Sequence, residues 1–193
     1  MSPELPESLR VLFMVLDALE ELGLPYHLGG SFASSIHGIP RQTQDIDLVV
    51  EIDAGDAARL VSLLEGEFYG SAPRARRAVG SGSSFNLVHL GSGVKVDLFP
   101  RGGSAFDREE FRRRIPLPLG EPPGRMTYVK SPEDTVLRKL LWFREGGGVS
   151  DRQWSDVVGV LGSQAGRLDR AYLERWAGEL GLTDLLARAL REP

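Results

Sequence analysis

Hydrophobic positions in the first third of the chain alternate between a helical and an extended spacing. Between residues 8 and 22, leucines and valines recur every three or four positions, which predicts an amphipathic helix. The periodic segments that follow are shorter and change type from one to the next. We expect a strand at 26–28, a helix at 31–37, a strand at 45–52 and a second amphipathic helix at 54–66.

The middle of the chain contains the pattern of a β-hairpin. Residues 84–90 and 94–99 both alternate between apolar and polar positions, and the short turn 91–93, Gly-Ser-Gly, joins them. The stretch before this pair, 70–83, is rich in glycine, serine and arginine. We expect a mobile loop there.

The pattern of the C-terminal part is helical throughout. Ser131 and Pro132, followed by two acids, are typical of a helix start. We expect helices at 132–145, 151–162, 169–180 and 183–191. The chain should therefore consist of a core of mixed helices and strands over 1–130 and a helical region over 131–193.

Composition narrows the class of protein. The 193 residues suit one domain, or a domain with a small appendage, and include no cysteine, which excludes disulfides and cysteine-ligated zinc. No apolar run approaches the roughly 20 residues that span a bilayer. The acidic start, Met1–Glu7, is unlike the basic start of a secretory signal. We expect a soluble, cytoplasmic protein with no membrane partner.

Charge gives two opposing indications about nucleic acid. The formal net charge of -4 argues against a protein that simply coats nucleic acid. Two arginine clusters, at 74–77 and 112–114, point the other way, although such clusters are more often solvated faces. Charge therefore does not decide whether nucleic acid is a partner, and the residues with candidate chemistry have to be considered.

Three aspartates carry that chemistry. Asp45 and Asp47 stand two apart on a predicted strand, so their side chains leave the same face. Adjacent like charges cost stability unless a cation lies between them. Asp97 lies on the second strand of the predicted hairpin, and the three carboxylates converge if that strand lies beside the first. Hard oxygen ligands with room for water suit Mg²⁺.

A glycine pair precedes the acids. Gly29 and Gly30 let the backbone approach a ligand, and Ser31 begins a predicted helix whose free N–H groups favour phosphate. Taken singly, an Asp-x-Asp pair or a Gly-Gly-Ser turn is common and most often has no function. A calcium loop is excluded because Val49 and Val50 occupy positions that need oxygen ligands or glycine, and the P-loop sequence is absent. Together, the turn and the three acids favour metal-assisted phosphoryl transfer.

In type, order and spacing, these parts resemble the signature of the polymerase-β-like nucleotidyltransferase superfamily. The segment concerned is Leu28-Gly-Gly-Ser-Phe-Ala-Ser-Ser-Ile-His-Gly-Ile-Pro-Arg-Gln-Thr-Gln-Asp-Ile-Asp-Leu-Val-Val50, with Asp97 as the third acid. Further segments look like the bacterial branch that contains the abortive-infection and toxin-type nucleotidyltransferases. They are Arg41–Asp45, Phe85–Val88, Ser131–Lys139 and the tail Asp151–Asp156. The likeness covers most of residues 26–180.

The resemblance implies a fold and a metal site. The implied fold class is α+β, a nucleotidyltransferase-type mixed β-sheet flanked by helices and followed by a C-terminal helical region. Asp45, Asp47 and Asp97 would be the catalytic residues and would hold Mg²⁺, with two ions expected. The substrate would be an NTP.

Phosphate contacts are implied as well. The turn Gly29–Ser31 would meet the triphosphate, and Lys139 would reach a phosphate or would instead be a surface residue. Arg41 and Thr43, just before the acids, could contact phosphate or orient the metal ligands, and Arg41 could equally cap the short helix. We expect Asp156 to make a polar contact on or between helices.

Two functions of different classes fit this pattern. The first is a Mg²⁺-dependent nucleotidyltransferase that moves NMP from an NTP to an acceptor hydroxyl or phosphate and releases pyrophosphate. Its acceptor stays open among RNA or tRNA, a protein hydroxyl and a small molecule. The second is a non-catalytic nucleotide-binding or partner-binding module of a toxin-antitoxin-type system, with a cognate antitoxin as partner. The intact third acid, Asp97, favours the enzyme.

Overall fold

The computed structural model describes residues 6–41, 43 and 45–192 of the chain. The chain divides into two compact units. The first comprises residues up to 29 together with 43–129, and the second comprises 30–42 together with the residues from 130 onward. Residues 30–42, which we expected to belong to the N-terminal segment, are therefore grouped with the C-terminal helices.

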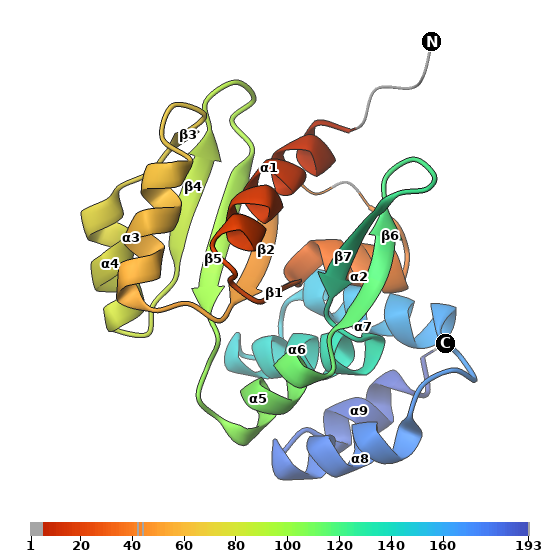
Figure 1. Cartoon of the computed structure of the whole chain (residues 1–193). Coiled ribbons are helices and arrows are strands. Elements are labelled where there is room, and N and C mark those ends of the chain that lie inside the picture. Colours follow the sequence, from red (N-terminus) through yellow and green to blue (C-terminus); the bar gives the residue numbers. More distant parts are fainter. Residues whose placement is uncertain (1–5, 42, 44, 193) are drawn as a thin grey trace. The chain divides into compact units, whose positions relative to one another are not determined.

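The first unit is built on one mixed sheet. In the described part of the chain, seven strands pair in the order β3-β4-β5-β2-β1-β7-β6 (Figure 1). The pairs β2–β5 and β1–β7 are parallel and the others antiparallel, so β4 and β5 form the expected hairpin. The strands are β1 (Tyr26–Leu28), β2 (Asp45–Val50), β3 (Phe68–Tyr69), β4 (Phe85–His89), β5 (Lys95–Pro100), β6 (Ile115–Leu119) and β7 (Arg125–Val129).

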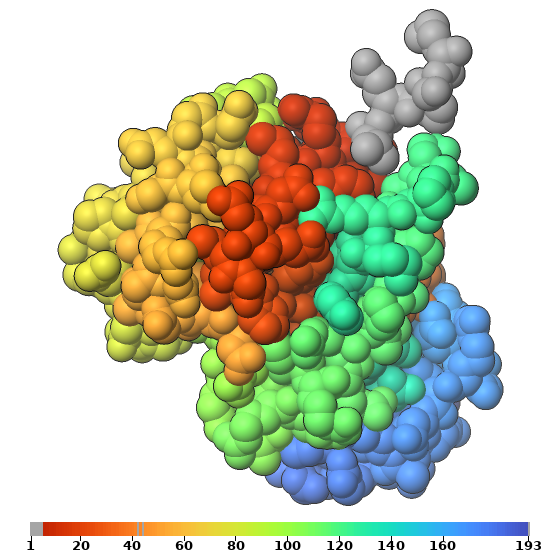
Figure 2. Space-filling view, viewed as in Figure 1, coloured from red at the N-terminus to blue at the C-terminus, as the bar shows by residue number. Residues whose placement is uncertain are grey.

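One face of this sheet is apolar and covered by helix. The helices of the first unit are α1 (Glu7–Glu21), α3 (Ala54–Leu63), α4 (Ala72–Gly80) and α5 (Ala105–Arg112). Leu48 at the centre of the sheet is fully buried. Near the start of α1, Glu7 lies 3.9 Å from His89 of β4, and farther along α1 Asp17 binds Arg125 of β7 at 2.6 Å. The helix therefore crosses the apolar face, and Figure 2 shows it in red beside α3.

The opposite face of the sheet is polar. α5 packs against it at β1, where the ring centroids of His27 and Phe111 are 5.5 Å apart. Farther along the sheet, Asn86 of β4 and Tyr69 of β3 are exposed to solvent. β4, which neighbours the strand that carries Asp97, and β3 beyond it thus present a polar and an aromatic side chain to solvent.

The second unit is a cluster of helices. These are α2 (Gly30–His37), α6 (Pro132–Glu145), α7 (Asp151–Ser163), α8 (Arg170–Glu179) and α9 (Thr183–Ala189). α6 is central, because Val136 and Leu137 on it are fully buried. The predicted start of α6 is confirmed: the Ser131 side chain accepts a hydrogen bond from the Asp134 N–H. No helix in the described residues has the length and apolar character needed to cross a bilayer.

Residues 70–83 do not form the mobile loop that we expected. Residues 72–80 form α4, with Pro73 in the first turn and Ala75 buried. The prediction was wrong because alanine and arginine favour a helix, and because Ala75 is the buried residue of this short helix, which leaves little hydrophobic periodicity. Glycine and serine in the stretch lie near its ends rather than in the helix centre.

The sequence analysis assigned no element to residues 101–130, where α5, β6 and β7 lie. α5 is short and mostly charged, and its start depends on a capping box between Ser104 and Asp107. β6 contains Pro116 and Pro118, and prolines argue against a central strand. They are tolerated because β6 is the last strand of the sheet order, with its outer side unpaired.

Gly38 allows the close approach of α2 to α7 within the second unit. A Cβ atom at Gly38 would lie 2.8 Å from the Ser34 carbonyl oxygen and 2.9 Å from the Val160 nitrogen. We expect Gly38→Ala to lower the free energy of unfolding by about 1–3 kcal/mol, because both neighbours are backbone atoms. Gly178→Ala on α8 is the control, since nothing lies within 4 Å of its Cβ position. Denaturant unfolding of both variants checks this, and equal effects would contradict it.

Candidate functional site

The register of β2 on β5 brings the three aspartates to one face of the sheet. Asp47 lies directly opposite Asp97 in the parallel pairing, and Asp45 lies opposite Lys95. Residues opposite each other in a sheet project to the same side, and so do residues two apart on a strand. All four charged side chains therefore project from the polar face, away from α1.

Lys95 is a member of this cluster that the sequence analysis did not single out. Its Nζ lies 2.7 Å from Oδ2 of Asp97. The hydrogen bond with Asp97, together with the charges of Asp97, Asp45 and Asp47, holds the pKa of Lys95 above its usual value despite partial burial. The alternation of strand residues was the available signal, because it places Lys95 on the side of Asp97 once 95–97 is assigned to a strand.

The donor set suits Mg²⁺ in kind, although Asp97 is engaged by Lys95. In the described residues, no group of three or more acidic, histidine or cysteine side chains is arranged to hold a metal ion. Asp45, Asp47 and Asp97 nevertheless offer hard oxygen donors from neighbouring strands, which Mg²⁺ prefers. The residues therefore fit the metal once the Asp97 carboxylate turns away from Lys95, and the ammonium group acts as a competing cation.

Lys95→Met removes the internal cation, so the three carboxylates repel one another in the metal-free protein. We expect the metal-free variant to lose up to about 1 kcal/mol of unfolding free energy, because the ion pair is partly exposed. We also expect it to bind Mg²⁺ more tightly than wild type. A Mg²⁺ titration followed by thermal unfolding measures both effects, with the charge-preserving Lys95→Arg as control. Equal Mg²⁺ affinity in wild type and Lys95→Met would contradict the competition.

The predicted turn lies against the strand that carries the acids. The N–H of Gly29 donates a hydrogen bond to the carbonyl oxygen of Asp47 at 2.8 Å. Gly30 has a φ of 52°, a left-handed conformation that favours glycine. Thr43 donates its hydroxyl to the carbonyl oxygen of Asp45 at 3.2 Å, so it helps to orient the start of β2.

Within the second unit, the hydroxyl of Ser31 accepts hydrogen bonds from two arginines. Nη2 of Arg41 lies 2.6 Å from Ser31 Oγ, and Nη2 of Arg152 lies 3.1 Å from the same atom. Arg41 also binds both carboxylate oxygens of Asp156, at 3.0 and 3.1 Å. The guanidinium groups at the start of α2 are suited to an anion such as phosphate.

Lys139 belongs to the same cluster. Its Nζ lies 2.8 Å from Oδ2 of Asp156, and only 4% of its side chain is exposed. The alternative that Lys139 is a surface residue is therefore wrong, and its contact with phosphate stays a prediction. Asp156 makes the expected contact between helices, since it joins α7 to α6 and to Arg41. Burial raises the pKa of Asp156, but the hydrogen bonds and charges of Arg41 and Lys139 outweigh burial and hold it below its usual value.

Arg152 is the residue of this cluster that the sequence analysis missed. It stands four positions before Asp156 on α7, so the two side chains share one face of the helix. The spacing was visible in the sequence, but it indicates no function until Asp156 is placed beside Ser31 and Arg41. Gly30, Ser31, Arg41 and Lys139 thus come together in the second unit, and Asp45, Asp47, Asp97, Gly29 and Thr43 lie in the first.

Asp156→Asn removes the carboxylate charge that binds the buried Lys139 and the half-buried Arg41. We expect the variant to lose about 3 kcal/mol of unfolding free energy at pH 7. Because the pKa of Asp156 is lowered in the folded protein, its contribution is fully present above the unfolded value near 3.8 and is lost as the pH falls through the lower folded value. The difference between wild type and variant should therefore shrink below about pH 4. Denaturant unfolding across pH measures it, with the exposed Asp151→Asn on the same helix as control.

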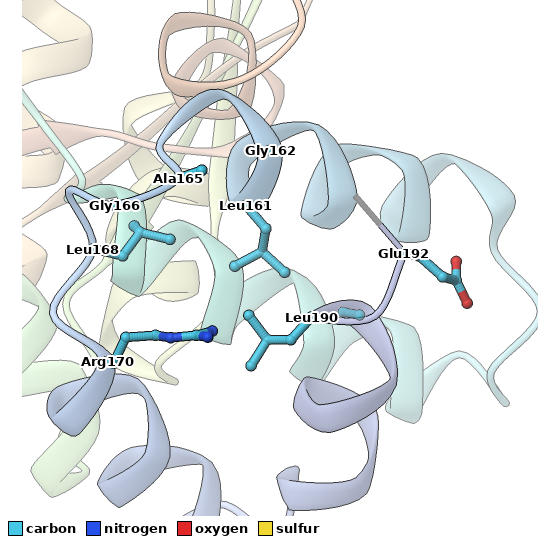
Figure 3. A pocket seen from close by; sticks show the side chains of 9 residues that line it. Leu161, Gly162, Ala165, Gly166, Leu168, Arg170, Leu190 and Glu192 are labelled. Atoms are coloured by element: carbon cyan, nitrogen blue, oxygen red, sulfur yellow. The ribbon is translucent and has the colours of Figure 1, made fainter.

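A hollow of about 390 Å³ lies elsewhere in the second unit, between α7, α8 and α9 (Figure 3). Leu161, Leu168 and Leu190 give it an apolar lining, and Arg170 and Glu192 stand at its sides. It contains none of the predicted site residues.

No family model matches the chain, and no curated protein matches it. Solved structures of nucleotidyltransferase type do match. The antibiotic-resistance factor ANT(2'')-Ia aligns with a TM-score of 0.58 at 16% identity, over 93% of this chain and 96% of that chain. An antigenic nucleotidyltransferase-like protein from Paracoccidioides brasiliensis aligns with a TM-score of 0.54 at 19% identity, over 99% and 95%.

A protein of the nucleotidyltransferase type from Thermotoga maritima, TM1012, aligns with a TM-score of 0.50 at 18% identity, over 77% of this chain and 92% of that chain. At these identities the likeness shows the fold. The chain has the nucleotidyltransferase fold, and the α+β class expected from the sequence is confirmed.

Proposed function

We propose that the protein is a Mg²⁺-dependent nucleotidyltransferase that moves NMP from an NTP to an acceptor hydroxyl or phosphate and releases pyrophosphate. The observation that supports this most is the register that sets Asp47 opposite Asp97 and Asp45 two residues before Asp47. Three carboxylates on one side of two neighbouring strands repel one another, and among these side chains and Lys95 the negative charge exceeds the positive. Their presence in this fold favours a bound cation and phosphoryl transfer.

The carboxylates have separate tasks in the proposed reaction. Asp45, Asp47 and Asp97 hold Mg²⁺, which when bound neutralises phosphate charge and lowers the pKa of the attacking hydroxyl. Asp97, on β5, accepts the proton of the acceptor hydroxyl. Lys95 releases Asp97 when the metal binds and then offers its positive charge to the substrate.

The cluster around Ser31 binds the triphosphate in this proposal. Arg41 and Lys139 both bind the carboxylate of Asp156, and Arg152 binds Ser31 beside Arg41, so positive charge exceeds negative among these residues. An anionic group that approaches Ser31 would meet guanidinium donors already oriented by hydrogen bonds. Asp156 keeps those donors in place, which makes it a positioning residue. For comparison, ANT(2'')-Ia has been solved with adenylyl-2''-tobramycin.

Two variants separate metal binding from catalysis. Asp45→Asn combined with Asp47→Asn should abolish Mg²⁺-dependent NTP binding and raise the melting temperature of the metal-free protein, because clustered charges are removed. Asp97→Asn should lower turnover by about 100-fold or more while it weakens NTP binding far less, because proton acceptance matters mainly in the transition state. Label transfer from each NTP to total RNA, protein and small alcohols measures turnover. Asp184→Asn on α9 controls for the loss of one surface charge.

The outcome of the Asp97 variant also decides between the two functional classes. Wild-type label transfer by Asp97→Asn would contradict the three-carboxylate mechanism and would favour the non-catalytic binding module.

The toxin-type branch and a cognate antitoxin are further parts of the proposal. Growth arrest of a bacterial host by the wild-type protein, and not by Asp97→Asn, would support a cytoplasmic toxin that acts by nucleotidyl transfer.

A further inference from the structure

A second hollow, of about 240 Å³, opens in the first unit where α4 begins and reaches the third acid. Its lining includes Tyr69 of β3, Arg74 of α4, Ser84, Asn86 of β4 and Asp97 of β5. Asn86 is the register partner of Asp97 on the side away from Asp47. Asn86, Asp97 and Asp47 therefore form one row across three strands of the polar face.

Asp97 in this hollow is bound by Lys95, whereas three other polar side chains of the lining have no such partner in the described part of the chain. Across the described residues, the side chains of Arg74, Ser84 and Asn86 make no hydrogen bond or ion pair with another residue. Tyr69 is 68% exposed, although it lies at the wall of a hollow. These side chains place a cation, a hydroxyl, an amide and an aromatic face around one space. Such a combination of groups is typical of a ligand subsite.

The position of the hollow matches the path that an acceptor must take. The Gly29 N–H is bound to the backbone of Asp47, so the glycine turn lies at the Asp47 end of the row. In phosphoryl transfer the attacking and leaving oxygens are roughly in line with the phosphorus. If the leaving pyrophosphate is held at the turn, the acceptor must approach from the opposite end of the row, beyond Asp97. The hollow occupies that end.

The charge of the hollow limits the acceptor. Arg74 is the basic residue of its lining, beside the acidic Asp97, and its guanidinium can pair with a phosphate. The exposed ring of Tyr69 offers a surface on which a nucleobase can stack. Asn86 and Ser84 offer hydrogen bonds to sugar hydroxyls and base edges.

We propose that this hollow is the acceptor subsite and that it binds a phosphate-bearing nucleoside, either a free mononucleotide or the 3'-terminal nucleotide of an RNA. This inference rests on the proposed nucleotidyl transfer. The acceptor hydroxyl oxygen forms a bond to the α-phosphorus of the NTP, and the bond from that phosphorus to the oxygen bridging to the β-phosphate breaks. Pyrophosphate leaves, and the hydroxyl proton passes to Asp97. Arg74 holds the phosphate of the acceptor and sets its specificity.

The test uses the full-length protein with Mg²⁺ and a saturating non-hydrolysable NTP analogue, so that a second nucleotide cannot occupy the NTP site. Adenosine, each nucleoside 5'-monophosphate, a single-stranded decaribonucleotide and tobramycin are titrated by calorimetry. We expect the monophosphates to bind about tenfold more tightly than adenosine, as one charge-assisted contact allows. Arg74→Ala should remove that preference, and Arg77→Ala, on the same helix but outside the lining, should keep it.

The titrations distinguish an RNA end from a free nucleotide. They also distinguish failure of the subsite from failure of the proposed nucleotidyl transfer. Tighter binding of the decaribonucleotide than of a monophosphate identifies an RNA end, and equal binding identifies the free nucleotide. The subsite would be overturned by any of three results. Adenosine and its monophosphate bind equally well, Arg74→Ala and Arg77→Ala show the same preference for the monophosphate, or tobramycin binds in place of the nucleotides. Failure of the NTP analogue to bind with Mg²⁺ would overturn nucleotidyl transfer itself, while the Arg74-dependent preference for phosphate would still report on the hollow.

Discussion

The parallel pairing of β2 with β5 is the constraint on which the candidate chemistry depends. Ile46 and Leu48 of β2, and Val96 and Leu98 of β5, are all fully buried on the face under α1. Because side chains alternate along a strand, a slip of one residue would bury the aspartates and expose the core. Burial of the apolar face therefore fixes the facing positions of Asp47 and Asp97. The energy that keeps like charges side by side comes from hydrophobic packing on the other side of the same strands.

Each of the two units contains its own cluster of charged side chains. The first presents carboxylates, which call for a cation, and the second presents arginines and a lysine around Ser31, which call for an anion. An NTP with Mg²⁺ carries both. The chain passes between the units at Gly29 and Gly30, of which Gly30 has a positive φ, and no side chain shields the backbone there. A short glycine turn thus links the residues proposed for metal with those proposed for phosphate.

The sequence predicted those elements whose hydrophobic period is strong and whose ends carry clear signals. α1, α6 and the β4–β5 hairpin are of this kind, and the direction of the Asp45 and Asp47 side chains followed from strand alternation. α4 was not predicted because Ala75 is its buried residue and one buried position shows no period, and β6 was not predicted because its prolines are acceptable only at an edge. Lys95 and Arg152 belong to the candidate clusters because of the residues that they contact in the folded protein. Hydrophobic periodicity does not identify those contacts.

The two edge strands of the sheet, β3 and β6, affect whether copies of this protein can aggregate by strand pairing. An open sheet edge presents free backbone groups that recruit strands from neighbouring molecules and start aggregation. β3, at one end, is two residues long and offers almost no template. β6, at the other end, has lost two of its backbone donors to Pro116 and Pro118. A sheet with one polar face is thereby protected from polymerising through its edges.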